Sequence, residues 1–153
     1  MARAVPTSDF KLDLSPVDGR RTGLSRSTVS SLVADLQAEL FRSDPHVTQM
    51  HWGGGTPTFL SDDELRELMA MLRRSFNIVA GAECSIEIDP RTVDGQRLEV
   101  LAELGFNRLS FGVQDFDPEV QKAVHRVQPA EQVFALMQEA RRIGFDSVNV
   151  DLI

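Results

Sequence analysis

The sequence predicts an α/β fold built on a parallel sheet. Segments typical of strands alternate along the chain with segments typical of helices, as right-handed crossovers between parallel strands require. One unit of helix stop, turn and strand also occurs twice with similar sequence, as L-G-F-N-R-L-S-F from Leu104 and I-G-F-D-S-V-N-V from Ile143. With 153 residues, of which 42% are hydrophobic, the chain has enough apolar material for one domain with a core.

The first part of the chain gives the weakest pattern. Residues 1–25 show neither helical nor strand periodicity, so we expect an irregular leader followed by one domain over 26–153. From Arg26, apolar residues recur at helical spacing and predict a first helix that ends near Ser43. A strand over 47–52 then leads into three successive glycines.

The later elements have clearer boundaries. Ser61 and Glu64 match a capping box, which predicts a second helix that ends near Phe76. Asp117 is a predicted N-cap and Gly144 a predicted helix stop. The remaining expected elements are a strand over 83–89, a helix over 96–104 closed by Gly105, a strand over 108–113, helices over 118–125 and 130–143, and a strand over 147–153.

Three of the predicted strands are polar on one face, although strands covered on both faces of a parallel sheet are apolar throughout. With a period of two, the polar sets are Ser85, Glu87 and Asp89; Ser110, Gly112 and Gln114; and Asn149 and Asp151. Carboxyl ends of parallel strands meet at one rim, so we expect Glu87, Gln114 and Asp151 to meet a ligand there. The alternative is one solvated face of a two-layer α/β domain.

The segment H-W-G-G-G-T-P-T, from His51 to Thr58, lies at the same rim. Three successive glycines suit a bend with positive φ, or a ligand that approaches the backbone closely. Carboxylates and amides suit ribose hydroxyls, whereas a glycine backbone suits an amino or carboxylate group. The combination indicates a binding site; a plain tight turn is the alternative.

Composition excludes several other functions. A net charge of −7 without a basic patch argues against a nucleic-acid partner. No apolar run of about 18 residues indicates a membrane span, and we expect a cytoplasmic protein. His51 and His125 lack metal-ligand spacing and are expected to be structural or surface residues, and Arg126 alone is typical of a solvated helix end.

The chain resembles a known family through several motifs in one order. From 26 to 153 it is similar to the oxygen-independent coproporphyrinogen III oxidases, radical S-adenosylmethionine enzymes of haem synthesis. The motifs are H-W-G-G-G-T-P-T, S-I-E-I-D-P-R, G-F-N-R-L-S-F-G-V-Q-D-F, V-Q-K-A-V-H-R-V-Q and N-V-D-L-I. The resemblance implies a partial (βα) barrel of about four βα units.

The resemblance also implies a reaction and its cofactors. A four-iron four-sulfur cluster reduces S-adenosylmethionine to a 5′-deoxyadenosyl radical, which abstracts hydrogen from the propionates of a tetrapyrrole substrate, and decarboxylation gives protoporphyrinogen IX. The implied contacts to S-adenosylmethionine are Gly54, Gly55 and Thr56 at the methionine end, Arg126 on its carboxylate, Gln114 and Asp151 on the ribose, and Glu87 on a bound molecule. A haem-binding branch of the family, proposed to act in haem trafficking, is the nearest alternative. The oxidase pattern, however, is matched by Asp89-Pro90-Arg91 and Gln114-Asp115-Phe116.

The chain departs from the family in its cysteines. The family's C-x-x-x-C-x-x-C motif is absent, and the single Cys84, which should face the helices beside Ile86, cannot replace three thiolates. The family also continues beyond residue 153. We therefore expect a fragment without oxidase activity and assign it no catalytic or metal-binding residue. We expect weak or no binding of S-adenosylmethionine and self-association through open sheet edges. The alternative is a cluster-free module that binds a nucleoside or haem.

Overall fold

The computed structural model describes residues 11–13, 31, 34 and 46–152. In chain order its elements are β1 (Lys11–Asp13), β2 (His46–Gly53), the short 3-10 helix η1 (Pro57–Phe59), α2 (Asp62–Ser75), β3 (Asn77–Ile88), α3 (Gly95–Glu103), β4 (Arg108–Gln114), α4 (Pro118–Ala123), α5 (Ala130–Ile143) and β5 (Ser147–Leu152). Strands and helices alternate from β2 onward, which confirms the α/β class.

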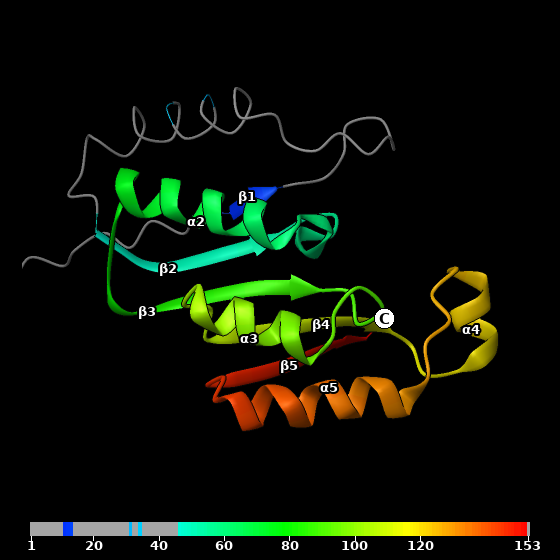
Figure 1. Ribbon diagram of the computed structural model, residues 1–153. Helices are drawn as coiled ribbons and strands as arrows, with labels where there is room; N and C mark the ends of the chain where they lie inside the picture. The colour runs from blue at the N-terminus through cyan, green and yellow to red at the C-terminus, as the bar shows by residue number, and fades with distance from the viewer. Residues whose placement is uncertain (1–10, 14–30, 32–33, 35–45, 153) are drawn as a thin grey trace, which may run out of the picture.

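The strands form one sheet in which sequence order is also spatial order. The sheet has five strands in the order β1-β2-β3-β4-β5, and every neighbouring pair is parallel. Helices α2, α3 and α5 lie over the same face, and α4 lies beyond the carboxyl ends of the strands (Figure 1). No helix of the described residues covers the opposite face. This arrangement is consistent with part of a (βα) barrel.

The helix boundaries follow from local capping chemistry. Ser61 and Glu64 form the predicted capping box, with the Ser61 hydroxyl accepting from the Glu64 amide and the Glu64 carboxylate accepting from the Ser61 amide. The Asp117 carboxylate caps α4, and Gly144 ends α5 with φ of 107°. These caps confirm the predicted starts of α2 and α4 and the predicted end of α5.

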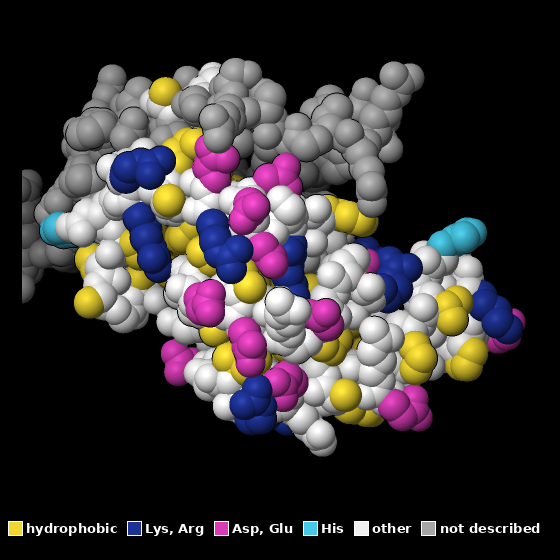
Figure 2. All heavy atoms as spheres, in the orientation of Figure 1, with side chains coloured by type: hydrophobic (Ala, Val, Ile, Leu, Met, Phe, Trp, Pro, Cys, Tyr) yellow, Lys and Arg dark blue, Asp and Glu magenta, His cyan; other side chains and the backbone are white. Residues whose placement is uncertain are grey.

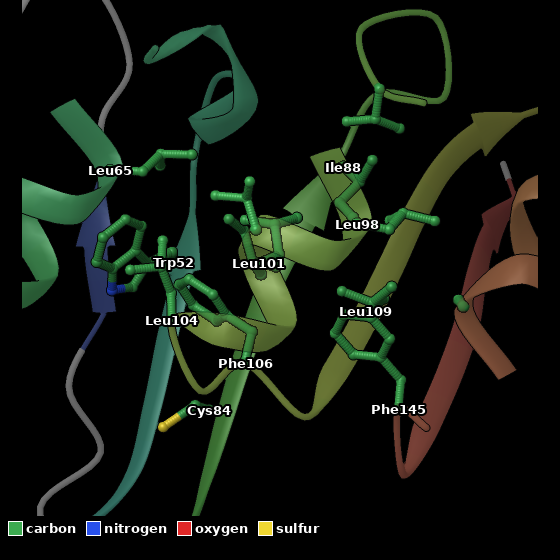
Figure 3. Packing of buried hydrophobic residues seen from close by; sticks show 14 of the residues in the cluster. Trp52, Leu65, Cys84, Ile88, Leu98, Leu101, Leu104, Phe106, Leu109 and Phe145 are labelled. Carbon is green, nitrogen blue, oxygen red and sulfur yellow. The ribbon is translucent and has the colours of Figure 1, made fainter. Parts of the chain in front are cut away.

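The core lies between the sheet and its helices. Alternate residues of β4, namely Leu109, Phe111 and Val113, are fully buried. Trp52 from the end of β2 meets Phe106 edge to face, with ring centroids 5.0 Å apart (Figure 3). Alternation therefore directs one face of each central strand into the core.

Three expectations need comment. Lys11–Asp13 lie in the segment predicted to be irregular, yet they form β1, because a strand of three residues gives no detectable periodicity. β3 begins at Asn77 rather than at residue 83, since its first half pairs with His46 and Val47 despite the positive φ of Gly81. The predicted first helix lies outside the described residues, except for Ser31 and Ala34, which are helical.

The face seen in Figure 2 mixes both signs of charge. On the helix-covered face, acidic and basic side chains are interspersed, and hydrophobic side chains are exposed over α4 (Figure 2). None of the helices in the described part of the chain is long and apolar enough to cross a membrane.

Candidate functional site

Within the strands, the predicted polar residues do share one face of the sheet, on the side opposite the helices, whereas Asp89 lies just after β3 and is buried. Strand register places His51 beside Ser85, Glu87 beside Ser110, and Gly112 beside Asp151. Their apolar neighbours along each strand enter the core, so no polar residue of these sets needs to point into it. Two groups of residues stand out on this polar face.

The first group surrounds the glycine bend at the end of β2. Gly54 and Gly55 adopt positive φ values of 79° and 61°, which explains the need for glycine at both positions. The Gly54 amide donates to Oε2 of Glu87 at 3.1 Å. Thr56 follows as the half-buried residue before η1. Glu87 therefore fixes the backbone of the bend from the neighbouring strand.

His51 and Ser85 extend this group toward the middle of the sheet. Nε2 of His51 lies 3.3 Å from Oε1 of Glu87, and Nδ1 lies 2.7 Å from Oγ of Ser85. The Ser85 hydroxyl can instead donate to the Met50 carbonyl at 3.4 Å, so the ring keeps partners on both nitrogens whether it is neutral or protonated. His51 is thus part of the polar face, a role that the alternation of β2 could have indicated.

The second group surrounds Gly112 in β4. Nη1 of Arg126 donates to the Gly112 carbonyl at 3.2 Å, and a Cβ added to Gly112 would lie 3.3 Å from that nitrogen and 3.8 Å from Nε2 of Gln114. Asp151 is the register partner of Gly112, and its Oδ2 accepts from the Ser110 hydroxyl at 2.7 Å. The absent side chain of Gly112 therefore leaves the space that Arg126 and Gln114 occupy.

Arg126 is the cation of this group that has no ion-pair partner among the described residues. No carboxylate of the described residues forms an ion pair with it, whereas Arg108 on the same face is paired with Glu83 at 3.2 Å. One guanidinium donor is used on a carbonyl, and the other donors can bind an anion such as a carboxylate. Arg126 thus has a more specific setting than a solvated helix end.

The loop after β4 is held by two buried glutamines that sequence reasoning did not single out. The Gln121 amide group donates to the Asp115 carbonyl at 2.9 Å and accepts from the Gln128 backbone amide at 3.0 Å. The Gln128 side chain donates to the Val113 carbonyl at 2.8 Å. Both side chains are buried, so these bonds determine the path of the chain toward Arg126. Two glutamines seven positions apart are too common in sequences to predict that they support a loop.

Asp89 follows β3 directly and is buried with 6% of its surface exposed. Burial alone would raise the pKa of its carboxyl group, but hydrogen bonds and positive charge from Arg91, with a contribution from the charge of Arg126, hold the pKa below its usual value. Arg91 donates to both carboxylate oxygens, with Nη2 at 2.6 Å from Oδ2 and Nε at 2.9 Å from Oδ1. Asp89 is therefore ionised and paired within its own turn.

The two groups meet through the register of β3 and β4, since Glu87 of the first group lies beside Ser110 of the second. Glu87, Gln114, Arg126 and Asp151 are half-buried or exposed on this face, rather than in the core. The sequence-based expectation that separate strands contribute to one polar surface is therefore met in the geometry. The roles of the individual residues toward a ligand stay predictions.

A separate hollow of about 510 Å³ lies between the starts of α2 and α3 and contains none of the predicted site residues. Arg97, in its lining, is already paired with Asp62 and donates to the carbonyls of Thr58 and Leu60. We therefore place the candidate site on the polar face, where Arg126 has no acidic partner among the described residues.

The residues do not fit an iron–sulfur cluster. Cys84 is the single cysteine of the sequence, it is buried in the core on the helix side, and burial raises the pKa of its thiol. Thiolate is the form that ligates iron, so this environment disfavours it. The described residues contain no group of three or more His, Cys, Asp or Glu side chains arranged to hold a metal ion.

Comparisons with known proteins show the family and the fold. The family model described as the radical SAM superfamily matches residues 19–153. Two similar proteins are named oxygen-independent coproporphyrinogen III oxidase: one from Salmonella typhimurium, 53% identical over 117 residues, and one from Escherichia coli K12, 55% identical over 108 residues. These matches cover 76% and 71% of this chain but 25% and 24% of the relatives. The chain thus spans about a quarter of their length.

A solved structure shows the same likeness. Coproporphyrinogen III oxidase from Escherichia coli, described as a radical SAM enzyme, superposes with a TM-score of 0.69 at 45% sequence identity. The superposition covers 85% of this chain and 31% of that one. The likeness therefore extends to the arrangement of strands and helices as well as to the sequence.

Gly53 should be sensitive to any side chain. A Cβ at Gly53 would lie 2.5 Å from Nε2 of His51 and 2.7 Å from Oε1 of Glu87, so Gly53→Ala must displace both groups. Both groups are ends of flexible side chains and can move, so the expected loss is that of their hydrogen bonds, about 0.5–1.5 kcal/mol in the free energy of unfolding, measured with urea. Gly95→Ala is the matched control, because its Cβ would meet Glu139 at an ordinary 3.5 Å and the residue begins a helix. Equal losses in the two variants would contradict this description of the bend.

The Asp89–Arg91 pair should make stability depend on pH. Because the folded-state pKa of Asp89 is lowered, the pair stabilises the fold fully above about pH 4, the pKa of an unfolded aspartate, and loses this effect as the pH falls through the folded-state value. Asp89→Asn should reduce the free energy of unfolding by about 1–3 kcal/mol at pH 7, and the difference from wild type should shrink below pH 4. Urea denaturation at pH 7 and pH 3 measures both.

Asp146→Asn is the control for this measurement, since Asp146 is exposed and its carboxylate has no hydrogen bond to another described residue. It should match wild type at both pH values. A difference between wild type and Asp89→Asn that is the same at pH 3 and pH 7 would show that the charge of Asp89 does not stabilise the fold.

Proposed function

This chain belongs to the radical SAM superfamily, and from that membership we propose that it forms the S-adenosylmethionine-binding part of an enzyme of the oxygen-independent coproporphyrinogen III oxidase type. The relatives that carry this name share about half of their residues with it over the matched region. The chain spans only a quarter of those relatives, so oxidative decarboxylation of a coproporphyrinogen is proposed for the whole enzyme type and not for this chain alone.

The observation that carries the proposal is that Arg126 has no ion-pair partner among the described residues. The guanidinium lies over Gly112 beside Gln114 and has no acidic partner among the described residues. A half-buried cation of this kind suits the carboxylate of an amino acid, which S-adenosylmethionine provides. Asp151 supplies acceptors suited to ribose hydroxyls on the same face. The donors and acceptors together fit this cofactor.

The proposed roles follow the chemistry of each group. Arg126 binds the carboxylate of S-adenosylmethionine, and Gln114 and Asp151 bind its ribose. Gly54, Gly55 and Thr56 present backbone groups to its methionine end, which a side chain at the bend would block. When bound, S-adenosylmethionine supplies the adenosyl group from which, in this family, the reactive radical is expected to come.

Glu87 has a second task in this proposal. Its Oε2 accepts from the Gly54 amide, so it holds the bend in shape before any ligand arrives. The other oxygen, Oε1, faces His51. A ligand that contacts Glu87 therefore meets a carboxylate whose orientation is already fixed, which reduces the entropy lost on binding.

The iron–sulfur cluster is a different matter, because the residues of this chain do not fit it. Cys84 is the sole cysteine, and it packs within the core. We propose that this chain binds the nucleoside without holding a cluster of its own, and so favour the cluster-free module over the weak or absent binding expected from the sequence. A tetrapyrrole substrate, a cytoplasmic location and self-association through the sheet edges stay predictions from the sequence.

Calorimetry with S-adenosylmethionine tests the proposed binding. The wild-type chain should bind one molecule saturably, and Arg126→Gln should weaken the affinity at least tenfold, about 1.4 kcal/mol, because the carboxylate loses its cation. Arg141→Gln is the matched control, since Arg141 is an exposed arginine on α5. No saturable heat from the wild type up to about 5 mM ligand, about 3 kcal/mol of binding free energy, would overturn the proposal.

Anaerobic reconstitution with iron and sulfide tests the absence of a cluster. We expect no stable four-iron absorption in the visible spectrum, because one buried thiol cannot supply three ligands. Cys84→Ala should give the same spectrum as wild type. A stable cluster that disappears in Cys84→Ala would show that this cysteine ligates iron after all.

A further inference from the structure

The motif Asp89-Pro90-Arg91 at the end of β3 has no task in the proposed binding site. Its two charged side chains are bonded to one another, with the Arg91 backbone amide also donating to Oδ1 of Asp89 at 3.0 Å. The backbone and side chain of Arg91 together provide four hydrogen bonds to this carboxylate. Asp89 accepts about as many bonds as a carboxylate can, and the guanidinium is locked in one orientation.

The locked guanidinium has one further contact, on a distant segment. Nη1 of Arg91 donates to the carbonyl of His125 at 3.0 Å. His125 is one of the two described non-glycine residues with positive φ, at 55°, a conformation that costs of order 1 kcal/mol and needs support from its surroundings. The contact therefore fixes the residue that immediately precedes Arg126.

Arg126 is held from its other side as well. Its backbone amide donates to the Gln121 carbonyl at 2.8 Å, and Nη1 reaches the Gly112 carbonyl. Asp89 also attracts Arg126 electrostatically. Because Arg91 fills the carboxylate of Asp89, Arg126 is left without an ion-pair partner and can point over Gly112.

We propose that Arg91, oriented by Asp89, is a positioning residue for Arg126: it fixes the His125 carbonyl and occupies the nearby carboxylate, so that the Arg126 guanidinium is ordered over Gly112 before a ligand binds. What Arg126 binds rests on the proposed function, but its order in the free chain does not. A lysine at position 91 would keep the charge beside Asp89 but could not bond the carboxylate in a fork and reach His125 at the same time.

The side-chain Nε–H signal of Arg126 in ¹⁵N NMR measures this order directly and without ligand. The signal is assigned by its loss in Arg126→Lys. In the wild-type chain we expect an order parameter in the rigid range, about 0.85, and in Arg91→Lys a value below about 0.6. Asp89→Asn keeps the side-chain shape and should show the same loss of order, so it provides the test if Arg91→Lys does not fold.

Arg97→Lys is the matched control. Arg97 also combines an ion pair with donation to backbone carbonyls, yet it contacts Asp62, Thr58 and Leu60 rather than the segment of Arg126. It should leave the Arg126 signal unchanged. The proposal is wrong if Arg126 stays rigid in a folded Arg91→Lys or Asp89→Asn chain, or if Arg97→Lys disorders it equally.

Titration with S-adenosylmethionine separates this proposal from the proposed function. Arg91→Lys should weaken binding at least fivefold in the wild-type background and have no further effect in Arg126→Gln, because it acts through Arg126. Equal effects in both backgrounds would contradict the positioning role. A wild-type chain that fails to bind would count against the proposed function only, since the NMR result decides the positioning role by itself.

Discussion

The alternation of side chains along β3 and β4 is the constraint on which both the core and the candidate site depend. Each strand has a period of two. The alternation that buries Phe111 and Ile86 against the helices therefore also directs Ser110 and Glu87 to the other face. A slip of one residue would exchange the faces and place carboxylates in the core. Core packing therefore fixes the register of the polar face, and the site needs no separate device to align its strands.

Register alone does not place Arg126, which comes from the loop after β4. Two non-glycine residues with positive φ, Gln114 and His125, mark the two ends of this loop region. Such conformations cost of order 1 kcal/mol each and persist where the surroundings determine them. Here the buried amides of Gln121 and Gln128 and the guanidinium of Arg91 supply that support. Strain and support occur together beside the residues proposed to bind the ligand.

The sequence was sufficient for features that depend on local chemistry. The caps at Ser61 and Asp117, the stop at Gly144 and the polar alternation of the strands all follow from residues close in sequence. β1 could not be predicted, because three residues have no period of their own and form a strand only through pairing with β2.

The missed parts of the site have a related cause. The contacts of His51 with Glu87 and of Arg91 with the His125 carbonyl join segments more than 30 positions apart, so they depend on the register and on the path of a loop. The separation between the polar face and Cys84, by contrast, has a local origin. Alternation along β3 directs Glu87 to the polar face and Cys84 into the core. The residues proposed to bind the nucleoside are thus independent of the only thiol. In this chain the binding face can form without an iron–sulfur centre, since none of its hydrogen bonds involves the sulfur.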